Sequence, residues 1–96
     1  MSIFLTKRAE KNYHSIKKFI SEEWGEAVSV AFEQKTKDFF ELLEKFPELG
    51  GLEFFDKEIR GFQLTRQTRV FYRIKEDSII ILSFFDVRQN PAKSPK

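Results

Sequence analysis

The spacing of apolar residues divides the chain into a helical first half and a strand-rich second half. Between positions 7 and 20 the apolar residues recur at steps of three and four, the spacing of one face of an α-helix; they are Ala9, Tyr13, Ile16, Phe19 and Ile20. Thr6 precedes this helix and is expected to cap it by accepting from a free backbone N–H group. A short apolar run from Ile3 to Leu5 comes before the cap and is expected to form a strand.

A second helix is predicted after a break at residues 21–25. Ser21 is a good N-cap, and Glu22 and Glu23 suit the positive end of a helix dipole. The apolar residues of this helix again follow helical spacing until Pro47 ends it; they are Trp24, Ala27, Val28, Ala31, Phe39, Leu42, Leu43 and Phe46. Two amphipathic helices joined by so short a link indicate an antiparallel helical hairpin.

After a glycine-containing turn at residues 47–51, the apolar period changes from 3.6 to two, which predicts strands. We expect them at residues 59–64, 69–75 and 79–85, joined by turns at 65–68 and 76–77. Because the links are short, these strands should pair antiparallel. The predicted fold is therefore α+β, in the order β-α-α-β-β-β, with the helical hairpin packed on one face of the sheet.

The turn at Glu76 and Asp77 sets which side chains share a side of the sheet. If Lys75 pairs with Ser78, the side against the helices should hold Val70, Tyr72, Ile74, Ile79, Ile81 and Phe85. The opposite side should then hold Arg69, Phe71, Arg73, Ile80, Leu82 and Phe84, and also Asp86 and Arg88 if the strand continues in register. A face that combines arginines with bare apolar side chains is expected to have a protein partner.

The register of the strand at 59–64 depends on the length of the loop that follows it. An even loop points Phe62 and Leu64 outward and sets Arg60 opposite Arg73, whereas an odd loop turns Phe62 and Leu64 into the core. We favour the odd loop, because it buries more aromatic surface, and we place Arg60 at the margin of the sheet.

The distribution of charge adds a second contrast between the two parts of the chain. Nine Lys and Arg residues stand against twelve Asp and Glu up to Glu58, but eight stand against three from Ile59 onward. Five of the six arginines lie in the second part, and a planar guanidinium group holds carboxylate or phosphate in a fixed geometry. The basic part therefore favours an acidic or polyanionic partner.

Length and composition exclude several classes of protein. Ninety-six residues suit a single domain, with residues 91–96 expected to be a flexible tail. The absence of Cys removes disulfides and zinc-finger sites, and a lone His14 cannot anchor a transition metal. No apolar run is long enough to span a membrane and no signal peptide is recognisable, so we expect a cytoplasmic protein without cofactor, metal or membrane contact.

Several segments occur in a characteristic order along the whole chain. They are Ile59 to Phe62, Arg69 to Ile74, Ile79 to Phe85 and Asp86 to Pro91, preceded by a helical hairpin with Trp24 and Ala27 and by the pairs Phe46-Pro47 and Gly50-Gly51. This combination resembles the RelE/ParE superfamily of bacterial toxins. The resemblance implies the same β-α-α-β-β-β fold and a toxin of a type II toxin–antitoxin module. It also implies an antitoxin that folds along the toxin surface and forms a hetero-oligomer with it.

The superfamily divides by target, and its ParE-like branch poisons DNA gyrase. This function requires a binding surface and no catalysis. The residues that we expect to bind the target or the antitoxin are Arg60, Phe71, Arg73, Leu82, Phe84, Asp86 and Asn90. We favour this branch.

The alternative is the RelE-like branch, whose members cut messenger RNA on the ribosome. Two arginines that stabilise the transition state in that branch are matched here by Arg69 and Arg88. Its strand lysines fall near Gly61 and Gln63, and the tyrosine after its last arginine is absent. Asp86 is the one carboxylate expected nearby, and we expect it to neutralise Arg88 or Arg60 rather than to act as a base. A degenerate, non-toxic member is a third possibility, so whether the chain is an enzyme stays open.

Overall fold

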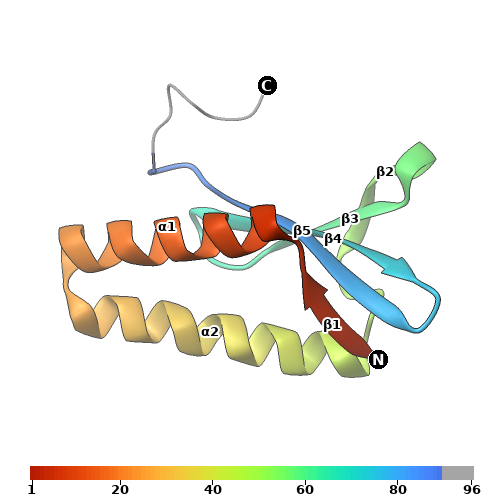
Figure 1. Cartoon of the computed structure of the whole chain (residues 1–96), viewed down its shortest axis with the longest axis horizontal. Coiled ribbons are helices and arrows are strands. Elements are labelled where there is room, and N and C mark those ends of the chain that lie inside the picture. The colour runs from red at the N-terminus through yellow and green to blue at the C-terminus, as the bar shows by residue number, and fades with distance from the viewer. Residues whose placement is uncertain (90–96) are drawn as a thin grey trace.

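A helical hairpin lies against one face of a five-stranded sheet (Figure 1). The computed structural model describes residues 1–89, and the segment that follows, with Asn90 and the expected tail at 91–96, lies outside the described residues. The elements in chain order are β1 (Ser2–Leu5), α1 (Lys7–Trp24), α2 (Glu26–Lys45), β2 (Gly51–Phe54), the 3₁₀ turn η1 (Phe55–Lys57), β3 (Ile59–Gln63), β4 (Thr68–Lys75) and β5 (Ser78–Asp86). The predicted α+β class and the predicted order of elements are confirmed, and one short strand, β2, is added.

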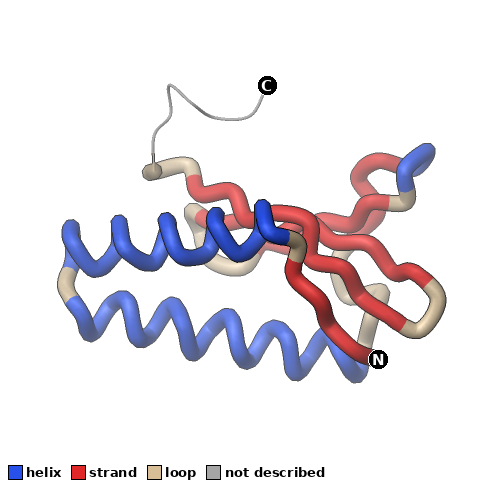
Figure 2. The backbone as a smooth tube through the Cα atoms, viewed as in Figure 1, coloured by secondary structure: helices blue, strands red, loops and turns tan. Residues whose placement is uncertain are grey.

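The strands lie in the order β1-β5-β4-β3-β2, so β1 and β2 are the edges and β3, β4 and β5 lie in the interior of the sheet. The three long strands pair antiparallel as predicted, whereas β1 pairs parallel with β5. Figure 2 shows the two helices gathered on one side of these strands. Sequence analysis missed β2 because all four of its residues are exposed, so it has no alternation of buried and exposed positions.

The predicted cap of the first helix is confirmed. The Thr6 hydroxyl accepts a hydrogen bond from the Ala9 N–H group and donates one to the Leu82 carbonyl, both at 3.0 Å. The break between the helices lies at Gly25, not at Ser21, which stays inside α1. Gly25 has a backbone φ of 96°, which residues other than glycine rarely adopt. The chain can therefore turn at this position.

The second helix buries a face that is rotated from the predicted one. Its buried residues are Ser29, Phe32, Thr36, Phe39 and Leu43. Val28 and Leu42, which belong to the predicted apolar face, are 44% and 42% exposed, and Trp24 and Phe46 are also exposed. Thr36 can be buried because its hydroxyl donates to the Phe32 carbonyl within the same helix. A hydroxyl satisfied in this way leaves no polar group unpaired.

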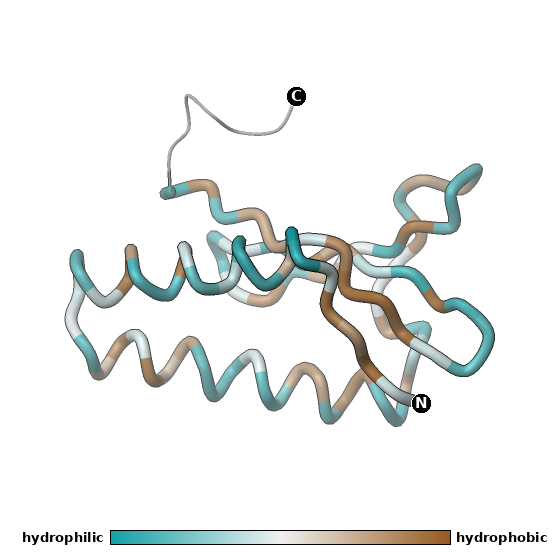
Figure 3. Tube along the Cα trace, in the orientation of Figure 1, coloured by the Kyte–Doolittle hydropathy of each residue, from teal (hydrophilic) through white to brown (hydrophobic). Residues whose placement is uncertain are grey.

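The core between the helices and the sheet contains Phe62 and Leu64, the two side chains predicted to point inward from the strand at 59–64. Arg60 pairs with Tyr72 and Phe62 pairs with Val70, so the odd loop is confirmed, with Phe62 and Leu64 turned toward the helices. The rings of Phe62 and Phe39 stack with centroids 4.5 Å apart. Figure 3 shows the apolar character of β1 and β5, the two strands that lie under α1.

Tyr72 fixes the start of β2 from inside this core. Its buried hydroxyl donates to the Pro47 carbonyl at 2.7 Å and accepts from the Gly50 N–H group at 2.8 Å. Burial raises the pKa of this phenol above its ordinary value. The connection between α2 and the sheet is therefore held at its middle.

Candidate binding site on the outer face of the sheet

A β-bulge divides β5 into two parts with different registers. From Ser78 to Ile81 the pairing with β4 follows the prediction, but Phe71 pairs with Ser83 and Val70 with Phe84, one position further along. The extra residue, Leu82, lies where the ladder is interrupted, and its carbonyl accepts the Thr6 hydroxyl. Every side chain of β5 after Leu82 is consequently turned to the side opposite to the predicted one.

The predicted positions of Phe84 and Asp86 on the exposed side are therefore wrong, as is that of Phe85 against the helices. Phe84 is 4% exposed and packs on Tyr13 of α1, and Asp86 is 6% exposed. Phe85 pairs with Arg69 instead and is part-exposed. The prediction failed because it counted along an unbroken ladder from the turn at 76–77, and a bulge shifts that count by one.

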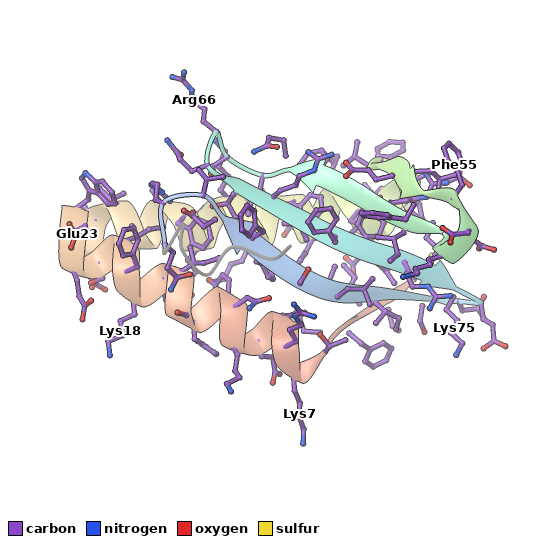
Figure 4. All side chains as sticks on the ribbon, turned by 90° about the horizontal axis from the view of Figure 1, so that it is seen from above. Lys7, Lys18, Glu23, Phe55, Arg66 and Lys75 are labelled. Carbon is purple, nitrogen blue, oxygen red and sulfur yellow. The ribbon has the colours of Figure 1, made fainter. Side chains whose placement is uncertain are left out.

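The side of the sheet turned away from the helices, here called the outer face, is rich in apolar side chains. In Figure 4, Phe55 projects at the β2 end of the sheet and Arg66 at the turn between β3 and β4, while Lys7 and Lys18 point away on α1. The apolar and arginine residues that the register also places on or beside this face are Phe4, Phe54, Arg69, Phe71, Arg73, Ile80, Leu82 and Phe85. Phe4 is 55% exposed and Phe55 is 76% exposed. The expected combination of arginines with apolar side chains is present, but Phe85 takes part in it where Phe84 and Asp86 were predicted.

Arg69 occupies the middle of the outer face and is already engaged. Its guanidinium forms an ion pair with the Glu53 carboxylate of β2, and its Nη1 donates to Gln63 Oε1 at 3.0 Å. The guanidinium carbon lies 5.9 Å from the centroid of the Phe71 ring. Gly61 of β3 lies directly beneath the ion pair, since a Cβ atom there would be 2.6 Å from Glu53 Cδ and 3.0 Å from Arg69 Nη2. The ion pair therefore requires glycine at position 61, because any side chain there would occupy its space.

Arg88 belongs to a second arginine–carboxylate site, on the helix side of the sheet. Asp86 Oδ1 accepts from the Arg88 backbone N–H and Nε, and Oδ2 accepts from Arg88 Nη2 and the Thr68 hydroxyl. The guanidinium also lies over the Trp24 ring, 5.2 Å from its centroid. Burial raises the pKa of Asp86, but the hydrogen bonds from Arg88 and Thr68 outweigh it and hold the pKa below its ordinary value. Asp86 therefore stays ionised as the counter-ion of Arg88.

The structure does not bring the two predicted catalytic arginines together. Arg69 faces away from the helices, whereas Arg88 packs against the end of α1, and each is neutralised by its own carboxylate. The predicted pairing of Asp86 with Arg88 is confirmed. Arg60 instead donates to the Gly50 carbonyl at 2.8 Å and holds the beginning of β2. Asn90, the remaining predicted site residue, lies outside the described residues.

Sequence analysis missed Glu53 and Gln63 as partners of Arg69. Glu53 lies in a strand without a periodic pattern, so nothing in the local sequence aims it at β4. The one available signal was Gly61, because an isolated glycine inside a strand pattern indicates a close approach of other groups.

Within residues 1–89 there is neither a helix suited to span a membrane nor a cluster of metal ligands. None of the helices in this range combines the length and the apolar character needed to cross a membrane. Nor do three or more His, Asp or Glu side chains of this range gather where they could hold a metal ion.

Comparisons with known proteins agree with this architecture. Residues 3–91 match the family described as the ParE toxin of the type II toxin–antitoxin system parDE. A chain of the chromosomal ParDE TA system from P. aeruginosa superposes with a TM-score of 0.75 at 20% identity, covering 90% of this chain and 95% of the other. The YoeB/ParE toxin from Agrobacterium tumefaciens gives 0.65 at 14% identity, covering 90% and 98%. A conserved hypothetical protein from Helicobacter pylori gives 0.52 at 17%, covering 93% and 97%. No curated protein matches the chain.

Proposed function

The chain belongs to the ParE toxin family of type II toxin–antitoxin systems, and from this membership we propose that it stops growth by binding an essential bacterial target, DNA gyrase. An antitoxin neutralises it by covering the outer face of the sheet. Catalysis forms no part of this function.

The observation that carries the proposal is the composition of the outer face. Phe4, Phe71 and Ile80 share it with Arg73, and no segment of residues 1–89 covers it as the helices cover the opposite face. A group of apolar side chains that the protein's own helices leave uncovered marks a contact with another protein. Aromatic and arginine side chains are also the types that contribute most to binding at protein interfaces.

The charge of this face supports an acidic partner. Arg73 is exposed and forms no ion pair with any of residues 1–89, while Arg69 is matched by the single carboxylate of Glu53. A segment that alternates apolar and acidic residues would satisfy the rings and the guanidinium groups together. We assign this role to the antitoxin.

The separation of Arg69 from Arg88 supports a binding function over messenger cleavage. Cleavage of RNA by its own 2′-hydroxyl requires cations arranged around one phosphate and a base for that hydroxyl. Here the two arginines lie on different sides of the sheet, and the nearest predicted base, Asp86, is engaged with Arg88 and Thr68.

The target is tested by inducing the protein in bacteria without its antitoxin. We expect double-strand breaks in DNA to rise while messenger RNA stays intact. Rapid loss of messengers before any DNA damage would overturn the gyrase proposal and favour the ribonuclease. Unaffected growth at confirmed expression would contradict both functions.

The antitoxin surface is tested with a charge reversal on the outer face. Arg73→Glu should weaken binding of the protein encoded by the neighbouring reading frame by about tenfold or more, because it opposes an acidic partner. Lys18→Glu makes the same change on α1, on the far side of the molecule, and should leave affinity unchanged. Equal weakening by both variants, measured by calorimetry, would rule out a specific role of this face.

A further inference from the structure

The two partners of the Arg69–Glu53 ion pair lie on strands that constrain them to different degrees. Arg69 and Gln63 lie on β4 and β3, paired opposite each other in the sheet. Glu53, the ion-pair partner of Arg69, lies on β2, an edge strand whose four residues are all exposed and whose pairing with β3 is irregular between Leu52 and Phe54. The guanidinium of Arg69 and the Gln63 amide that accepts from it are therefore fixed by the sheet, whereas the carboxylate belongs to one of its least constrained strands.

The arrangement has the features of a carboxylate-binding site. One edge of the guanidinium group meets Glu53 and another meets Gln63, which orients the fork. Gly61 leaves the space above β3 in which the carboxylate lies. From these contacts we propose that Arg69, Gln63 and Gly61 form a carboxylate-binding site that Glu53 occupies in the free protein. An Asp or Glu side chain of a peptide segment bound along the outer face replaces it.

Such an exchange is feasible because the pair is only partly shielded. The side chains of Arg69 and Glu53 keep 32% and 28% of their exposure, and ion pairs so open to water are weak. When a peptide carboxylate enters, Glu53 returns to solvent on its exposed strand. Glu53 is then an internal competitor that lowers the affinity of every acidic ligand of this site.

The surroundings of Arg69 favour a peptide over a nucleic acid. Phe71 lies beside the guanidinium, and Phe85 is paired opposite Arg69 in the sheet, so both rings are placed to contact apolar side chains. A nucleic-acid backbone instead needs a track of cations. The strands of this face carry Arg69 and Arg73, with Arg66 on the turn beyond them, and Glu53 already occupies Arg69. The identity of the peptide as an antitoxin segment rests on the proposed function, but the chemistry of the site can be tested without it.

The test compares Glu53→Gln with the unaltered protein, using a labelled peptide of alternating Glu and Leu and a matched peptide of alternating Gln and Leu. We expect Glu53→Gln to bind the Glu peptide about threefold to tenfold more tightly, since the competitor has lost its charge. Binding of the Gln peptide should stay unchanged. Adding Arg69→Gln should abolish the gain.

Glu58→Gln is the matched control, because it removes a carboxylate beside the same segment that forms no ion pair with residues 1–89. Its affinity for the Glu peptide should equal that of the unaltered protein. Thermal unfolding verifies that each variant is folded, and Glu53→Ala serves as a second variant if Glu53→Gln is not.

Four results would overturn the inference. They are no binding of the Glu peptide by any variant, no gain in Glu53→Gln, an equal gain for the Gln peptide, or a larger gain for a single-stranded oligonucleotide. A failure of the proposed function is seen separately. It would appear as unaffected growth on induction, or as an antitoxin affinity that Arg73→Glu leaves unchanged, while the expected differences in peptide affinity are still measured.

Discussion

Arg88 and Arg69 each hold a carboxylate, but their surroundings give the two pairs different roles. The carboxylate of Asp86 has no exposed surface, accepts from Arg88 and Thr68, and joins the end of β5 to the helical hairpin through Trp24. The carboxylate of Glu53 lies on an exposed edge strand and meets Arg69 across a glycine. The same chemical pair is structural where it is enclosed and exchangeable where water reaches it.

The largest expected effect comes from the enclosed pair. Asp86→Asn should lower the free energy of unfolding by about 2–3 kcal/mol, because it leaves the Arg88 guanidinium without its counter-ion. Urea denaturation of the variant and the unaltered protein measures this loss. A change below about 0.5 kcal/mol, the size typical of surface substitutions, would remove the distinction between the two sites.

The pH dependence of stability sharpens the same contrast. Because the pKa of Asp86 is lower in the folded protein than in the unfolded chain, its stabilising contribution is present above about pH 4 and is lost as pH falls through the folded-state pKa. The stability difference between the unaltered protein and Asp86→Asn should therefore shrink on acidification below pH of about 4. Urea titrations at a series of pH values measure it, and a difference independent of pH would contradict the assignment.

A smaller effect is expected from the ring that covers Arg88. Trp24→Leu should cost about 1 kcal/mol, because it keeps an apolar side chain but removes the cation–π contact. Trp24→Phe retains a weaker aromatic face and should lose less. Thermal melts of both variants test this order, and an equal loss in the two would show that the ring's faces contribute nothing to Arg88.

The smallest effect on stability is expected at the exchangeable pair. Glu53→Gln should change the free energy of unfolding by no more than about 0.5 kcal/mol, because the ion pair is partly open to water. Denaturation under the conditions used for Asp86→Asn provides the measurement. A loss above about 1 kcal/mol would make this pair structural as well and would argue against its exchange with a ligand.

The spacing of apolar residues predicted those helices, strands and turns whose conformation depends on residues close together in sequence. The helical spacing around Ile16, the alternation around Val70 and the two-residue turn at 76–77 each determine an element from neighbouring residues. The odd loop before Thr68 followed from burial of Phe62 and was confirmed. These features depend on contacts that are close in sequence or on the general demand to bury rings.

The errors arose where distant residues decide the local geometry. The bulge at Leu82 is supported by Thr6 from the other end of the chain, and it alone turned Phe84 and Asp86 inward. The buried face of α2 includes Ser29 and Thr36, which binary patterning counts as polar. The pair of Glu53 with Arg69 spans two strand pairings, so neither residue's neighbours reveal it.

The parallel pairing of β1 with β5 also constrains how the protein is made. Thr6 and Leu82, which hydrogen-bond in the finished fold, are 76 positions apart. During translation the helical hairpin can form early, but β1 must wait until β5 has left the ribosome before it finds its neighbour. The sheet of the nascent protein is therefore completed only after Asp86 has left the ribosome.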